Sequence, residues 1–254
     1  MSTLQFIGTA TTLLRLGPFT LLTDPNFLHR GQYAYLGKGL VSKRLTDPAM
    51  DVGDLPPLDA VVLSHLHGDH FDRVARRGLD RSVPLVTTRH AARRLGPRGF
   101  EAVALGTWEQ HALERDGHRL TIESLPGVHA YGVMGRLLPP VMGSLLTLRR
   151  GEETLLTVYL TGDTLLGDHL TAIHERHPQI DVAVVHLGGT KVLGALVTLD
   201  GAGGVEPAAA GAPGVRGAGA LRRLPGVPVA AARLRDGVGP RAAPGDHRAH
   251  RRAR

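Results

Sequence analysis

Four potential metal ligands fall within six residues of this chain, in the run His65-Leu66-His67-Gly68-Asp69-His70. The run has the pattern H-x-H-x-D-H and directly follows the apolar stretch 59–63, which predicts a buried strand. The ligands are therefore expected on the loop that leaves the end of this strand, where open α/β sheets place their sites. His-rich runs also occur on protein surfaces, but the strict pattern after a strand favours a metal site.

The spacing of the four side chains suits two neighbouring ions. In an extended loop, alternation directs His65 and His67 toward one side, whereas Asp69 and His70 lie beyond Gly68, which lets the backbone fold back. Neutral imidazole binds zinc at ~2.0–2.1 Å, and a carboxylate adds a harder oxygen ligand. We expect two divalent ions, with Zn2+ as the first choice and Mn2+ or Fe2+ also compatible with these ligands.

Two further segments carry potential ligands after predicted strands. A β-rich run at 155–160 is followed by Gly162, which permits a turn that aims the Asp163 carboxylate inward. His129 follows the loop signal Pro126-Gly127, after a predicted strand at 118–125. A loop His taken alone is more often solvated, but in a chain that already has the H-x-H-x-D-H run this position favours a ligand.

These segments resemble, in order, four motifs of the metallo-β-lactamase superfamily of hydrolases, and in particular its ascorbate-lactonase-like and phosphodiesterase-like branch. The resemblance runs from about Leu4 to Glu206. It implies an α+β fold of the four-layer αββα sandwich type, in which two sheets lie face to face with the metal site at one edge. The matching segments are Leu21-Leu22-Thr23-Asp24-Pro25, residues 64–72, Pro126-Gly127-Val128-His129-Ala130 and Thr161-Gly162-Asp163-Thr164.

The resemblance also implies a role for each matching side chain. The first ion would bind to three imidazoles, and the second to Asp69 and His70, with Asp163 bridging both ions. Asp69 and Asp163 are the expected catalytic residues. Asp24, His186 and Tyr131 are expected to brace the ligands or to contact substrate. The ligands of the first ion would be His65, His67 and His129.

The implied activity is that of a metal-dependent hydrolase in which a metal-bound hydroxide cleaves an ester, lactone or phosphodiester bond. A subordinate version would use iron for redox chemistry on the same fold. The alternative is an inactive, truncated pseudoenzyme whose basic tail binds polyanions.

The composition limits the class of protein further. A chain of 254 residues can bury a large core and would ordinarily form one α/β domain or two small ones. It contains no Cys, which excludes disulfides, Cys-ligated zinc and thiol catalysis. Residues 1–5 lack the features of a secretory leader, and no apolar run is as long as a membrane span. We therefore expect a cytoplasmic protein with a small-molecule substrate.

The last 48 residues differ in composition from the rest. Residues 1–206, the expected hydrolase domain, carry 20 basic and 21 acidic side chains, whereas residues 207–254 carry 10 Arg and only 2 Asp. This tail contains no aromatic residue, Ile, Met, Ser, Thr or Lys. It is therefore a low-complexity segment that is not expected to form a hydrophobic core. One interpretation is a disordered basic arm that binds nucleic acid nonspecifically.

We favour a frameshift near the codons for Glu206 and Pro207. Read one base later, the codons permitted for the tail include a V-P-V strand and an H-Y-D-D-Y segment like those of the family, with its His arising across Ala220 and Leu221. The chain as written would then lack the final strand, the final helix and the last His ligand of the second ion. Low solubility or partial disorder is expected, because a sheet edge or face would be left open.

The sequence predicts the elements around the site and a mouth above it. The irregular stretch 26–50 could form a flap, and Tyr131 with residues 137–140 could line the same mouth. Five other histidines, at 111, 118, 169, 174 and 177, have charged or polar neighbours and are predicted on the surface. Helices are predicted at 71–77, 89–95 and 166–177. Strands are predicted at 4–7, 12–16, 20–23, 60–63, 85–88, 119–125, 144–149, 155–161 and 182–186.

Overall fold

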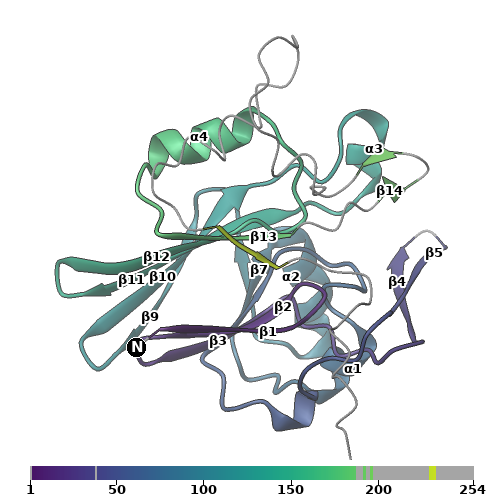
Figure 1. Ribbon diagram of the computed structural model, residues 1–254, viewed down its shortest axis with the longest axis horizontal. Coiled ribbons are helices and arrows are strands. Elements are labelled where there is room, and N and C mark those ends of the chain that lie inside the picture. The colour runs from purple at the N-terminus through teal and green to yellow at the C-terminus, as the bar shows by residue number, and fades with distance from the viewer. Residues whose placement is uncertain (1, 38, 187–190, 193–194, 197–228, 233–254) are drawn as a thin grey trace, which may run out of the picture.

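Two sheets of six strands lie face to face, and helices cover their outer faces (Figure 1). The computed structural model describes residues 2–37, 39–186, 191–192, 195–196 and 229–232. The arrangement confirms the αββα sandwich that the sequence predicted.

The first sheet is built from the N-terminal part of the chain. Its strand order is β1-β2-β3-β6-β7-β8, with antiparallel pairing from β1 to β3 and parallel pairing from β3 to β8. Helices α1 (Arg73–Gly78) and α2 (Arg89–Leu95) pack on its outer face. The strands are β1 (Thr3–Gly8), β2 (Thr11–Leu16), β3 (Phe19–Thr23), β6 (Ala60–Leu63), β7 (Leu85–Thr88) and β8 (Ala102–Leu105).

The second sheet has the order β16-β13-β12-β11-β10-β9, and helix α4 (Asp168–Arg176) packs on its outer face. Strands β10, β12 and β13 run in one direction, so their carboxyl ends meet at the same edge. The strands are β9 (Gln110–Arg115), β10 (His118–Pro126), β11 (Met142–Arg150), β12 (Glu153–Leu160), β13 (Val182–His186) and β16 (Val229–Ala232).

Alternation along the buried strands produces three apolar layers. Leu21 faces the core between the sheets, whereas Leu22 faces α1 and α2; Leu146 and Leu145 divide in the same way between the central core and α4. Since both faces are buried, these strands are apolar throughout, which explains why the sequence predicted them well.

The structure contains several elements that the sequence did not predict. Strand β9 is rich in charged and polar residues, and it is held by regular antiparallel pairing with β10 rather than by strand propensity. The remaining unpredicted elements are β4 (Tyr33–Gly37), β5 (Leu40–Lys43), β8, β14 (Lys191–Val192), β15 (Ala195–Leu196), β16, α3 (Gly132–Leu137) and the 3-10 turns Val52–Asp54 and Gly96–Arg98.

The C-terminal tail contributes one described element. Val229–Ala232 forms β16, which pairs in parallel with β13 at the edge of the second sheet, where the sequence predicted that a final strand would be missing. The rest of 207–254, including the position of the hypothesised frameshift, lies outside the described residues. In the described part of the chain, no helix is long and apolar enough to cross a membrane.

Candidate metal centre

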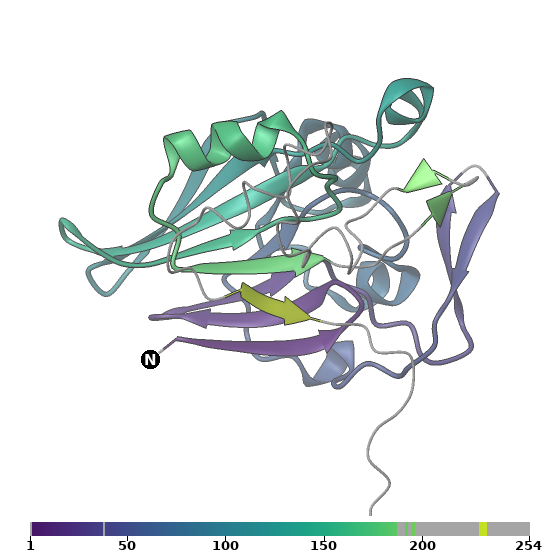
Figure 2. The same cartoon turned by 45° about the horizontal axis from the view of Figure 1, so that its top comes forward.

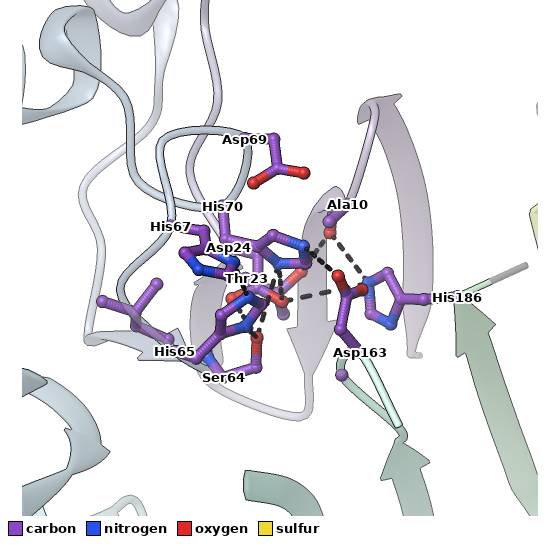
Figure 3. Close-up of polar contacts among 12 residues, drawn as sticks. Ala10, Thr23, Asp24, Ser64, His65, His67, Asp69, His70, Asp163 and His186 are labelled. Atoms are coloured by element: carbon purple, nitrogen blue, oxygen red, sulfur yellow. Dashed lines mark hydrogen bonds and ion pairs between the residues drawn. The ribbon is translucent and has the colours of Figure 1, made fainter. Parts of the chain in front are cut away.

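Loops from both sheets converge at one edge of the sandwich. The loops after β3 and β6 come from the first sheet, and those after β10, β12 and β13 come from the second. The Met142 amide, at the start of β11, donates a hydrogen bond of 3.1 Å to the carbonyl of Ser64, which joins the sheets at this edge. The loops therefore bring side chains that are distant in the sequence to one place (Figure 3).

Three buried imidazoles form the first group. Nε2 of His65 lies 3.0 Å from Nδ1 of His67, and Nε2 of His129 lies 3.3 Å from the same atom. One ligand nitrogen of each ring lies within 4.8 Å of the others. The sequence predicted these three residues as ligands of the first ion, and the structure brings them together.

A second group adjoins the first. Nε2 of His70 lies 3.2 Å from Oδ2 of Asp163, and Nδ1 of His70 lies 3.2 Å from Oδ2 of Asp24. His65, His70 and Asp163 also have ligand atoms within 4.8 Å of one another. His70 and Asp163 therefore sit together, as the sequence expected for the second ion.

Asp69 is the one predicted ligand outside these two compact groups. Its Oδ1 is buried and has no hydrogen-bond partner, while its backbone carbonyl accepts a hydrogen bond of 2.9 Å from Asn26 Nδ2. A buried carboxylate oxygen without a partner is costly, and a bound cation would satisfy it. The donor set of imidazoles and carboxylates, with this unsatisfied oxygen, fits a divalent ion.

Burial keeps two imidazoles of the first group neutral. Desolvation, reinforced by the neighbouring His70 and His129, holds the pKa of His65 well below its usual value. The same effects, led by desolvation, lower the pKa of His67 to about 3. Neutral rings offer their lone pairs at physiological pH, which is the form that binds a metal ion.

In the second group the pKa of the imidazole is raised rather than lowered. Burial alone would lower the pKa of His70, but Asp163, Asp24 and Asp69 raise it well above its usual value. Burial alone would raise the pKa of Asp163, yet the adjacent His70 lowers it to about 2. Burial raises the pKa of Asp69, with His70 opposing and Asp163 reinforcing the effect. A positive charge is thus stabilised among three carboxylates.

Asp24 braces the loop 64–72, which carries His65, His67, Asp69 and His70 and is called the metal loop below. Its Oδ1 accepts hydrogen bonds from the backbone N–H and the hydroxyl of Ser64, at 2.8 and 2.9 Å, while Oδ2 faces His70. Asp24 has a φ of 39°, a conformation that non-Gly residues seldom adopt. The strain is held by Thr11, whose hydroxyl donates to the Asp24 carbonyl at 2.7 Å. The sequence predicted a bracing role for Asp24, and this geometry is suited to it.

The other end of the loop is fixed by Asp72. Its Oδ2 accepts hydrogen bonds from the amides of Phe27 and Leu28 at 2.6 and 2.8 Å, while its Oδ1 caps helix α1 through Ala75 N–H at 2.7 Å. One carboxylate therefore ties the segment after β3 to the metal loop and to α1.

The other two residues proposed to brace ligands or contact substrate lie in different places. Nε2 of His186 is 3.9 Å from Oδ2 of Asp24 and 3.4 Å from the Ala10 carbonyl, and its ring centroid is 5.9 Å from that of His70. Tyr131 is 58% exposed and donates its hydroxyl hydrogen to the Leu166 carbonyl at 2.7 Å. His186 thus adjoins the ligands, whereas Tyr131 lies on the surface beside the loop that carries His129.

The sequence missed two supports of the site. Ser64 contacts both Asp24 and the rings of His65 and His70; its place just before the motif was the available signal. His169 was predicted on the surface, but it is partly buried and its Nε2 lies 2.9 Å from the Thr164 hydroxyl. Thr164 in turn accepts the Val128 N–H at 2.9 Å, so it connects the loops of Asp163 and His129.

The fold and the clustered ligands define a metal-dependent hydrolase of the αββα type. Residues 20–208 match the family model described as the beta-lactamase superfamily domain, so the chain belongs to this superfamily of metallo-β-lactamase fold. This confirms the family that the four motifs suggested.

Two curated proteins are similar in sequence to this chain. UPF0173 protein YddR of Bacillus subtilis (strain 168) is 28% identical over 184 residues, which are 69% of this chain and 68% of that protein. N-acyl-phosphatidylethanolamine-hydrolyzing phospholipase D 1 of Caenorhabditis elegans is 30% identical over 135 residues, 49% of this chain and 37% of that protein.

Solved structures share the fold. The isothiocyanate hydrolase from Delia radicum gut bacteria superposes with a TM-score of 0.69 at 22% identity, covering 91% of this chain and 84% of that one. A possible metal-dependent hydrolase from Veillonella parvula DSM 2008 has the same TM-score, identity and coverage.

Proposed function

We propose that this chain is a hydrolase that binds two divalent ions, with zinc as the expected metal, and cleaves an ester, lactone or phosphodiester bond. The observation that carries the proposal is the convergence of His65, His67 and His129, from both sheets, on one buried point beside His70 and Asp163. When bound, such ions supply a nucleophile from water at neutral pH and polarise the oxygen of the scissile group.

The chain's own groups would divide the work. His65, His67 and His129 would hold the first ion, and Asp69 and His70 the second, with Asp163 between them. The unpartnered Oδ1 of Asp69 would bind the second ion, and the other oxygen of this carboxylate would accept a hydrogen bond from an attacking water. Asp24, through Ser64 and His70, would keep the ligands in position, and ligand-bracing groups of this kind commonly affect metal affinity.

His186 and Tyr131 have separate proposed roles. His186 adjoins Asp24 and His70, so it would hold these two groups in place from the side of β13. Tyr131 follows the ligand His129 by two residues and is exposed, so it would contact substrate at the mouth of the site. The sequence-based assignment of both residues to bracing or substrate contact is retained as part of the proposal.

The chemistry of two bound ions is compatible with all three bond types. A pair of ions suits any oxygen that gains negative charge in the transition state, whether carbonyl or phosphoryl. A phospholipase D that hydrolyses N-acyl-phosphatidylethanolamine is among the proteins similar to this chain, so a phosphodiester should be tested first.

Elemental analysis combined with hydrolysis assays tests the proposal. The purified full chain, stripped with a chelator and reloaded with zinc, is expected to retain metal and to hydrolyse bis(p-nitrophenyl) phosphate, p-nitrophenyl acetate or a simple lactone. His67→Ala should reduce both the metal content and the turnover. His118→Ala, at the start of β10 and outside the ligand groups, is the matched control and should change neither.

The opposite results would identify a non-catalytic protein. A chain that retains no metal after reloading, and whose nucleic-acid binding falls steeply with salt, would support the pseudoenzyme with a polyanion-binding tail. A chain that binds metal but hydrolyses none of the three substrates would remove these bond types from the proposal.

A further inference from the structure

Exposed apolar side chains gather on two segments beside the metal centre. Among the described residues nine large apolar side chains are exposed, and six of them belong to the segments 33–45 and 131–137. Large exposed apolar patches mark interaction sites more often than isolated exposed residues do. The six are Tyr33, Tyr35, Val41, Leu45, Tyr131 and Leu137.

The hairpin of β4 and β5 presents one apolar face. Tyr33 is paired with Lys43 and Tyr35 with Val41, so these four side chains share a face. Ala34, whose side chain points to the other face, is buried. The two strands form a separate sheet, and an isolated two-stranded hairpin is marginal in water unless another surface supports it.

Both segments are fastened to the metal loops. The Gly68 amide donates a hydrogen bond of 3.0 Å to the Tyr35 carbonyl, which holds β4 against the loop that carries His67. Leu40 of β5 and Leu138 both pack around Ala130, the residue after His129. The hairpin and α3 project on the same side of the molecule in Figures 1 and 2. We call the exposed residues of 33–45 and 131–137 the rim.

The charge of these segments has a single sign. Among the described residues of 33–45 and 131–137, the exposed basic side chains are Lys43 and Arg136, and neither segment contains Asp or Glu. Tyr rings favour the boundary between apolar and aqueous phases, and Lys and Arg stems lie along apolar surface while the charge stays in water. Arg44 is buried and donates to the Leu28 carbonyl, so it does not add to the charge of this surface.

We propose that the rim docks on the surface of an anionic lipid bilayer, with the metal centre facing the lipid. Exposed tyrosines and aliphatic side chains would enter the interface, and Lys43 and Arg136 would meet the negative headgroups. A symmetric contact between two copies would bring these cations against one another, which argues for an anionic surface rather than a second copy as the occupant. This inference goes beyond hydrolysis and does not depend on bound metal.

Vesicle sedimentation with the full chain tests the proposal. The protein is expected to bind vesicles of phosphatidylcholine mixed with phosphatidylglycerol and to bind pure phosphatidylcholine much more weakly. The double substitution Tyr35→Ser with Val41→Ser should lower binding to the mixed vesicles by about tenfold or more, because both side chains are exposed and contribute buried apolar area only on docking. Lys43→Glu should weaken binding to mixed vesicles and leave the weak binding to phosphatidylcholine unchanged.

A matched control separates the rim from the rest of the surface and from the basic tail. Leu4→Ser with Leu155→Ser removes two apolar side chains outside the rim, which are 42% and 41% exposed, and should leave binding unchanged. Equal binding of the rim variant, this control and the wild type would overturn the proposal and assign any binding to the tail. So would a rim variant that converts a dimer to a monomer in light scattering, since the occupant would then be a second copy.

The variant His67→Ala distinguishes a failure of vesicle docking from a failure of the proposed hydrolysis. His67→Ala should bind mixed vesicles as the wild type does, whatever its activity. Loss of vesicle binding in His67→Ala with the rim intact would contradict docking by the rim alone.

Discussion

At the scale of single residues, the Asp24 carboxylate contacts several groups of the candidate metal centre at once. Asp24 accepts two hydrogen bonds from Ser64 and faces His70, and it does so from a strained backbone conformation. Strain of this kind persists only where the surrounding structure enforces it, and it is concentrated at functional sites.

Replacement of Asp24 should lower the affinity of the site for its metal ion. Asp24→Asn keeps the size of the side chain but loses the negative charge that faces His70, and loss of a group that orients a ligand typically costs about 10–100-fold in metal affinity. Competition with a chromogenic chelator measures this affinity. Asp80→Asn, at an exposed turn, is the control; equal affinities of the two variants would show that Asp24 does not support the ligands.

The buried imidazoles make the metal-free protein sensitive to acid. His67 has a pKa of about 3 in the fold, whereas an unfolded chain protonates His near pH 6.5, so between these values the unfolded state binds more protons. The contribution of His67 to stability is therefore lost as the pH falls from about 6.5 toward 3.

Thermal melting of the metal-free protein at several pH values tests this sign. Between pH 7 and pH 5 the melting temperature of the wild type should fall further than that of His67→Gln, because the glutamine side chain does not bind a proton in this range. Asp163 and His70 are present in both proteins. The effect of His67 is therefore the difference between the two losses of melting temperature. A parallel decline in the two proteins would contradict the burial of a neutral His67.

At the scale of elements, the contact between β4 and the metal loop is close enough to constrain the sequence. A Cβ added at Gly68 would lie 2.3 Å from the Tyr35 carbonyl oxygen and 2.8 Å from the Tyr35 nitrogen, both of which are backbone atoms that cannot rotate away. Glycine is needed here for a close approach of two backbones.

Gly68→Ala should therefore displace the hairpin or the loop. We expect a loss of roughly 1–3 kcal/mol in unfolding free energy, as for other overpacked sites, together with weaker metal binding. Gly53→Ala, where an added Cβ meets no atom within 4 Å, is the matched control. Chemical denaturation and chelator competition measure the two effects, and a Gly68→Ala variant indistinguishable from this control would refute the close contact.

The sequence predicted the buried strands better than the exposed ones. Strands β3, β6, β7 and β13 have continuous apolar runs, so the sequence predicted them within a residue or coincided with them. The hairpin of β4 and β5 was predicted only as an irregular stretch, because its strands are short, interrupted by glycine and exposed on one face. Its position depends on contacts with Gly68 and Ala130, which no local pattern reveals.

The candidate ligands were more predictable than the groups that support them. His65, His67 and His70 share one motif, and the loops of His129 and Asp163 follow strands whose ends meet. His169 carries no such signal, since it lies on a helix among polar neighbours and reaches Thr164 only because α4 packs beside that loop. Long-range packing, rather than composition, determines its environment.

At the scale of the whole molecule, the charge is divided unequally along the chain. Residues 1–206 are nearly neutral, and the excess of positive charge belongs to residues 207–254. The proposed frameshift near Glu206 and Pro207 would account for this change of composition.

Resequencing the gene across these codons tests the frameshift directly. A protein with the frame restored should bind its second ion more tightly than the chain as written, because it would regain a ligand. Elemental analysis after limited chelation compares the two proteins. An unchanged gene sequence, together with equal retention of the second ion, would favour the basic arm.

The donors of the candidate centre come from both halves of the sandwich: His65 and His67 leave the first sheet, whereas His129 and Asp163 leave the second. A cation held by both sets would act as a removable crosslink between two layers that are otherwise joined mainly by apolar packing. Chelation should then accelerate amide hydrogen exchange at the ends of β6 and β12 together, while the far ends of the same strands stay protected.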